Sequence, residues 1–146
     1  MIRNAFLTVV FGLCLLFSVA AQEKVTWKDL ADVNFTSKYF DATDEYFLVP
    51  DFGKSVKELE GKEISITGYF LSLSPEDGIY MLSQNPMASC FFCGGGGPES
   101  VMEVKFTNTP AFKTDEVVTV TGKLKLNADD VNHCNYIVTG ASGFAL

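Results

Sequence analysis

The residues best suited to chemistry are two cysteines, Cys90 and Cys93, which flank two phenylalanines and precede four glycines and a proline. This Cys-x-x-Cys spacing brings two sulfur atoms within reach of one metal ion or of each other. A third cysteine, Cys134, directly follows the only histidine of the chain, His133. These four side chains form the candidate site.

The first interpretation of Cys90 and Cys93 is metal binding, with zinc as the expected metal. In a zinc knuckle, glycine after the second cysteine lets backbone amides point at thiolate sulfur. One knuckle supplies half of a tetrahedral site, so Cys134 and His133 are the candidate third and fourth ligands. Adjacent residues of a strand face opposite ways, so these two can share an ion only in a turn. Thioether ligands would shift the preference toward copper(I), and the candidates are Met81, Met87 and Met102.

Two alternatives to a metal remain for the cysteines. A structural disulfide from Cys90 or Cys93 to Cys134 would close about forty residues and contribute roughly 4 kcal/mol on the chain-entropy model. Thiol–disulfide exchange requires a helix N-terminus that lowers the thiol pKa. Four glycines and Pro98 cannot propagate a helix, so exchange is poorly supported, although no other enzymatic activity is supported better. Metal and disulfide both stay open.

Other reaction classes lack their residues. The run Gly94–Gly97 is not followed by Lys-Ser or Lys-Thr, which excludes a nucleotide-binding phosphate loop. Acidic residues are scattered through expected turns, and no nucleophile and base are paired as a hydrolase needs. We therefore expect a non-enzymatic binding protein that binds or delivers a transition metal. The alternative is a protein–protein interaction module, with Phe91 and Phe92 as contact residues and the cysteines as a disulfide.

Residues 1–21 have the pattern of a secretory signal peptide. Arg3 provides a positive start, residues 5–17 are apolar, and small residues follow at 18–21. We expect cleavage there, no stable membrane insertion afterwards, and a periplasmic or extracellular protein in which disulfides can persist. Cys14 leaves with the leader, so the exported chain keeps an odd number of cysteines.

Length and charge limit the class of partner. Of the 146 residues, those left after leader removal, 22–146, suit one domain. The net charge of −7 becomes −8, because the leader contains Arg3 and no acidic residue. Nucleic acids are bound by neutralising phosphates with Lys and Arg, so this balance argues against a nucleic-acid partner. A metal ion or another protein is the expected partner.

Alternation of apolar and polar residues predicts an all-β domain with minor helix. Residues 22–59 are expected to form an N-terminal extension that packs on a barrel spanning residues 60–146. In the extension we expect a short turn over 27–31, an extended stretch over 45–50 and one helical turn over 55–59. In the barrel we expect five strands, at residues 64–71, 79–83, 101–107, 117–126 and 136–144, with a turn at Pro75 to Gly78.

Three glycines inside these strands, Gly68, Gly122 and Gly140, suit the bulges and bends of a small closed barrel. Residues 60–69 and 115–124 resemble the first and fourth strands of OB-fold domains. That resemblance implies a five-stranded Greek-key barrel.

The chain also resembles a family of small secreted bacterial proteins of unknown function. The resemblance rests on Trp-Lys-Asp-Leu at 27–30, Leu-Glu-Gly-Lys at 59–62 leading into Gly68 and Tyr69, and cysteines after the second strand. It implies export and a barrel, and it supplies no activity.

Overall fold

The structure is a computed structural model that describes residues 22–146. The predicted signal peptide, residues 1–21, and Cys14 lie outside the described residues. The strands are β1 (Glu23–Lys24), β2 (Val33–Phe40), β3 (Glu45–Phe52), β4 (Glu63–Ser74), β5 (Ile79–Ser83), β6 (Val101–Phe106), β7 (Val117–Leu126) and β8 (Tyr136–Ala145). A short helix, α2, spans Lys54–Lys57, and 3₁₀ turns span Pro75–Asp77, Met87–Ser89, Phe91–Cys93 and Pro98–Ser100. From Gln22 onward, none of the helices has the length and apolar character needed to cross a bilayer.

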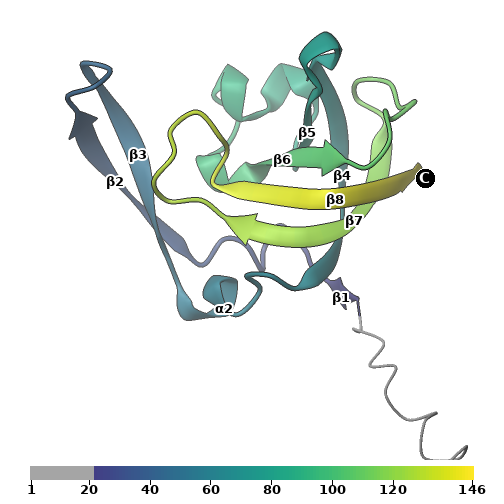
Figure 1. The fold of residues 1–146 in the computed structure, drawn as a ribbon, viewed down its shortest axis with the longest axis horizontal. Coiled ribbons are helices and arrows are strands. Elements are labelled where there is room, and N and C mark those ends of the chain that lie inside the picture. The colour runs from purple at the N-terminus through teal and green to yellow at the C-terminus, as the bar shows by residue number, and fades with distance from the viewer. Residues whose placement is uncertain (1–21) are drawn as a thin grey trace, which may run out of the picture.

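Five strands close into a barrel (Figure 1). The order is β4-β5-β6-β8-β7, and β7 pairs back onto β4. The β6–β8 pairing is parallel, and the other four pairings of the barrel are antiparallel. The predicted fold class, a mostly-β chain with a five-stranded barrel, is confirmed, and the strand order is consistent with the expected OB-like Greek key.

The predicted strand bounds agree closely with the structure. The second and fourth barrel strands have the expected bounds, and the Pro75–Gly78 turn ends with Gly78 in the left-handed region at φ 70°. The first barrel strand, β4, is longer than predicted and extends to Ser74. It pairs with β7 over its first half and with β5 over its second half, and Tyr69 pairs with both. One long bent strand therefore joins the two sides of the barrel.

Two of the three strand glycines lie where the pairing is irregular, as expected. Gly140 has φ +61° beside the β6–β8 register shift, and Gly122 lies at the β7–β8 shift. Of the bulge or bend expected at Gly68, the bulge is absent, since Gly68 pairs in regular register with Val118 and the β4 bulge occurs between Ser72 and Ser74. Gly68 is needed for close approach instead, because a Cβ there would lie 2.6 Å from the carbonyl oxygen of Ser83.

The barrel strands bury side chains on two faces. The inner face forms the main core, which includes Phe70, Leu82, Met102, Val104 and Tyr136. On the outer face, Leu71, Met81, Cys90 and Val101 form a second apolar cluster. This outer cluster is covered by the loop that connects β5 to β6, and it is the reason that β5 is apolar at successive positions.

The N-terminal segment packs on the barrel through a turn at residues 27–30. Leu30 is fully buried in the main core, and its carbonyl accepts a 2.6 Å hydrogen bond from the hydroxyl of Tyr136 in β8. The Trp27 Nε1–H donates to the carbonyl of Thr67 at 2.9 Å. These two bonds tie the segment to β8 and to β4.

Strands β2 and β3 form a separate antiparallel hairpin that stands beside the barrel (Figure 1). Residues 33–40 were not predicted as a strand, and the extended stretch predicted at 45–50 continues through Pro50 to Phe52. The hairpin's base is anchored by Phe52, whose ring centroid lies 5.6 Å from that of Tyr136. Its outer half is largely exposed.

Candidate functional site

The cysteine loop lies against the outer cluster of the barrel. Cys90 is fully buried there beside Leu71, Met81 and Val101. The side chain of Cys93, one 3₁₀ turn later, is exposed. The loop therefore contributes one cysteine to packing and presents the other to solvent.

The backbone amides of this loop already have acceptors. The N–H groups of Cys93 and Gly95 donate to the Cys90 carbonyl, and that of Gly94 donates to the Phe91 carbonyl, each at 3.0 Å. A zinc knuckle needs such amides to point at thiolate sulfur. Two glycines of the run have a backbone reason: Gly94 has φ +77°, and a Cβ on Gly95 would lie 1.8 Å from the Ser89 carbonyl oxygen.

The Cys93 thiol is not electrostatically activated. Its Sγ donates to the Met87 carbonyl at 3.2 Å. Desolvation, followed by the effect of neighbouring Cys90, raises the pKa of Cys93 above that of an ordinary thiol. A redox-active or nucleophilic cysteine needs the opposite shift, which agrees with the poor support for thiol–disulfide exchange in the sequence.

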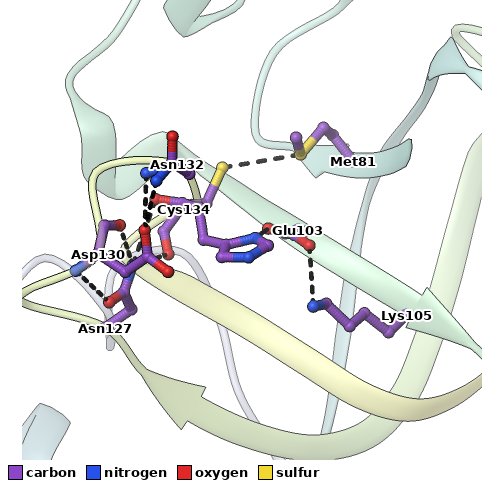
Figure 2. A network of polar contacts seen from close by, with 8 residues as sticks. Met81, Glu103, Lys105, Asn127, Asp130, Asn132 and Cys134 are labelled. Atoms are coloured by element: carbon purple, nitrogen blue, oxygen red, sulfur yellow. Dashed lines mark hydrogen bonds and ion pairs between the residues drawn. The ribbon is translucent and has the colours of Figure 1, made fainter. Parts of the chain in front are cut away.

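Cys134 lies in the connection between β7 and β8, residues 127–135. Its Sγ is 3.7 Å from the Sδ of Met81 in β5 (Figure 2). Burial, with a smaller contribution from the charge of Glu103, raises the pKa of Cys134 to about 12. Cys134 also packs against the outer cluster that contains Cys90.

His133 is directed to a carboxylate. Its Nδ1 lies 2.8 Å from Oε2 of Glu103 in β6, and the other oxygen of Glu103 is 3.4 Å from the Lys105 ammonium. Met81 and Glu103 are directly opposed in the β5–β6 pairing, so both lie on the outer barrel face. The register of two strands thus places an acid beside Cys134 and His133.

The four predicted metal ligands do not surround one point. Across residues 22–146, no group of three or more His, Cys, Asp and Glu side chains is placed to hold an ion. Cys90 and Cys93 are neighbours, Cys134 contacts Met81, and His133 contacts Glu103. All three cysteines of this range are free thiols.

Asn127 fixes the shape of the connection that carries His133 and Cys134. Its amide nitrogen donates to the carbonyls of Asp130, His133 and Cys134 at 2.7, 3.3 and 3.2 Å. Its amide oxygen accepts the Asp130 N–H at 3.0 Å (Figure 2). The connection is therefore a defined turn, which meets the requirement for His133 and Cys134 to act on one side of the molecule.

A groove of about 420 Å³ runs between the hairpin and the barrel. One wall is the β3 segment 46–49, and the opposite wall is the connection 128–135. Outward residues of β5 and β6 form the floor, among them Met81 and Glu103, and Phe91, Phe92 and Pro98 of the cysteine loop close one end. Cys134 and His133 both line it.

The groove is apolar, and its charged groups are acidic. Large side chains on its rim are well exposed, with Tyr46 72%, Phe92 52% and Leu48 50% accessible. Of the described residues that line it, Glu103 and Asp130 carry negative charge and none is Lys or Arg. An exposed apolar patch of this kind is typical of an interaction site.

Sequence reasoning identified Phe91, Phe92, Cys134 and His133, which all line the groove. It missed Glu103, Asn127 and the whole β3 wall. A signal for β3 exists in the run Tyr-Phe-Leu-Val at 46–49, which is apolar on both faces although it lies outside the barrel. No local pattern distinguishes Glu103 from other acids of the chain.

Comparison with known proteins supports the fold. No model of a known protein family matches the chain, and no curated protein sequence does. A similar solved structure is the crystal structure of a DUF3299 family protein from Pseudomonas aeruginosa. It is 15% identical, with a TM-score of 0.54, and the match covers 86% of this chain and 97% of that one. At this identity the likeness shows a shared fold alone.

Proposed function

We propose that this chain is an exported, non-enzymatic binding protein whose groove receives an extended segment of a partner protein. The observation that carries the proposal is the position of β3. Within residues 22–146 the hairpin is a two-stranded sheet, so one edge of β3 has no strand partner in this part of the chain. Four consecutive β3 residues, 46–49, line the groove and no β2 residue does, so the free edge faces it.

An extended segment can add to such an edge as a third strand. Backbone hydrogen bonds then supply affinity, and alternate side chains enter pockets that supply specificity. Pro50 has no N–H to donate, so the usable edge ends there and covers about the length of a short strand. A volume of about 420 Å³ has room for several side chains of such a segment.

The charges of the groove indicate the chemistry of the segment. Apolar side chains would cover Tyr46, Leu48 and Phe92, and a Lys or Arg would approach Glu103 and Asp130. The net charge of −7, which becomes −8 when the leader with Arg3 is removed, favours association with a basic partner. The same charge disfavours an oligonucleotide, the ligand of many OB-type barrels.

A displayed library of random peptides, selected on the folded protein, tests the proposal. We expect enriched peptides in which apolar residues alternate and a Lys or Arg lies at a fixed offset. The synthetic form of an enriched peptide is then measured by fluorescence anisotropy. N-methylation of alternate amides, which removes donors to β3, is expected to weaken binding in one phase of alternation and not in the other.

Two phenylalanines give a matched pair of variants. Phe92 and Phe144 are 52% and 58% exposed, and only Phe92 belongs to the groove lining. Burying a Phe side chain stabilises by about 1.5–3 kcal/mol, so Phe92→Ser should weaken the peptide at least about tenfold. Phe144→Ser should leave the affinity within about twofold. Equal effects of the two variants, or peptides insensitive to both, would reject the groove as the binding site.

A further inference from the structure

The floor of the groove holds a pair of sulfur atoms from distant parts of the chain. Cys134 Sγ and Met81 Sδ are 3.7 Å apart, and both residues line the groove (Figure 2). Met81 is 8% exposed, and its side chain belongs to the outer apolar cluster. The pair is thus sheltered but lies next to an open cavity.

The separation suits two ligands of one soft ion. Metal–sulfur bonds of about 2.3 Å place two sulfur atoms roughly 3.8 Å apart at an angle near 110° and about 4.6 Å apart when linear. Either geometry needs the sulfurs to separate by less than about 1 Å. Methionine has three rotatable bonds and adapts readily to such a change.

The surroundings select the charge of the ion. The pair lies against apolar side chains, where an uncompensated charge is costly. One thiolate and one neutral thioether cancel a single positive charge, whereas a divalent ion would keep one charge in excess at the two sulfur atoms, because the nearby Glu103 carboxylate already contacts Lys105 and His133. Zinc would also need further ligands, and residues 22–146 offer no group of three His, Cys, Asp or Glu.

We propose that Cys134 and Met81 bind one monovalent thiophilic cation, copper(I) or its redox-inert analogue silver(I). Thiolate and thioether are the ligand types that copper(I) prefers. Glu103 lies close enough for its charge to act on Cys134, and that negative charge attracts the incoming cation. The site differs from the predicted zinc site in its ligands, its metal and its place on the groove floor, and it does not depend on the peptide-binding proposal.

Binding is a simple exchange of a proton for a metal ion. The Cys134 S–H bond breaks, its proton passes to solvent, and the Cys134 sulfur and the Met81 sulfur each bond to the cation. No electron is transferred. A cysteine thiol is protonated at neutral pH, whereas the metal ligand is the thiolate. One proton is therefore released per ion, and the dissociation constant should rise about tenfold for each unit by which pH falls.

The experiment is a competition titration under anaerobic conditions, in which the protein takes copper(I) from its bicinchoninate complex. Residues 22–146 carrying Cys93→Ser are the starting protein, because this change removes the exposed half of the neighbouring Cys90–Cys93 pair. We expect one equivalent of copper(I), with two sulfur scatterers at about 2.3 Å in X-ray absorption. A second titration with silver(I) should give the same stoichiometry.

Further variants assign the ligands. Adding Cys134→Ser should abolish binding. Adding Met81→Leu should weaken it by at least about tenfold, since even groups outside the first coordination shell typically contribute 10–100-fold. Met102→Leu is the matched control, because Met102 is buried in the main core and should leave the affinity unchanged. Circular dichroism checks that each variant is folded.

Each other outcome overturns the assignment. If the Cys93→Ser protein takes no copper(I), the site does not exist. If Cys134→Ser retains the ion, the ligand is another group. If Met81→Leu and Met102→Leu behave alike, the thioether is not a ligand, and an affinity independent of pH would contradict the proton exchange.

Discussion

Replacing Tyr136 by phenylalanine removes a single oxygen atom from the centre of the molecule. That hydroxyl donates a 2.6 Å hydrogen bond to the carbonyl of Leu30, and both residues are fully buried. Burial, with nearby Glu99 and Asp32, raises the pKa of Tyr136, so its hydroxyl remains a donor at ordinary pH. The bond joins the N-terminal segment to β8, so its loss should weaken the attachment of that segment to the barrel.

The magnitude follows from burial. In Tyr136→Phe the Leu30 carbonyl loses its donor in a region that water does not reach, and an unsatisfied buried acceptor costs about 1–3 kcal/mol. Tyr80→Phe is the matched control. Tyr80 lies in the same core, but its hydroxyl makes only a 3.4 Å contact with the Pro75 carbonyl. Its loss should change the free energy of unfolding by less than about 0.5 kcal/mol.

The assay is urea unfolding followed by the fluorescence of Trp27, the single tryptophan. Trp27 donates to Thr67 in β4, so its emission reports attachment of the N-terminal segment to the barrel. We expect an unchanged slope and a lower midpoint for Tyr136→Phe. Coincident curves for Tyr136→Phe and Tyr80→Phe would refute the reasoning, because the buried bond would then contribute no more than the long contact.

Three further changes have expected outcomes. Gly122→Ala would place a Cβ 2.8 Å from a backbone carbonyl oxygen of β8 and should lower the free energy of unfolding by about 1–3 kcal/mol. Gly140→Ala, at φ +61° with open space around it, should lower it by about 1 kcal/mol. Thermal unfolding measures both changes. Alkylation by iodoacetamide, followed by mass spectrometry, should modify the exposed Cys93 first. The alkylation rate of Cys134 should rise with pH up to about 12, because only the thiolate reacts. A plateau of that rate near pH 9 would contradict the burial of Cys134. Hydrogen bonds from the backbone and side chain of Asn132 lower the pKa of Asp130 in the folded protein. The ionised carboxylate therefore stabilises the 127–135 turn. This stability is fully present above the ordinary Asp pKa of 3.8 and is lost as pH falls through the lower pKa of the folded state. Amide chemical shifts of that turn should show a midpoint below pH 3.8, and Asp130→Asn should remove it.

The barrel could be predicted because its signals are local. Alternation in residues 117–126 and the Pro75 to Gly78 turn depend on neighbours in the chain, and both were located correctly. The role of Gly68 could not be predicted in the same way, since the atom that excludes a side chain there belongs to Ser83 on another strand. Strand β2 was missed because its exposed pattern is governed by pairing with β3 rather than by a buried face.

The residue types of the candidate site, cysteine and histidine, were predicted correctly from the sequence. The residues that they contact in the fold were not predicted. The Cys134–Met81 and His133–Glu103 contacts join residues 53 and 30 positions apart. They depend on the β5–β6 register, which sets Met81 beside Glu103, and on the turn that Asn127 stabilises. Spacing along the chain favoured Cys90 and Cys93, whereas packing buried one of them and exposed the other.

The long strand β4 has a consequence for how the chain folds. Its neighbour β5 follows closely in sequence, but the hydroxyls of Thr67 and Thr119, which bond across β4 and β7, are 52 residues apart. The entropy of closing that loop must be lost before the pairing stabilises anything, so closure of the barrel belongs late in folding. Until then one edge of β4 is open, and an open edge invites pairing with other chains. The outward side chains of β4 near this edge are polar, namely Glu63, Ser65 and Thr67. They should reduce aggregation of the sheet before the barrel closes.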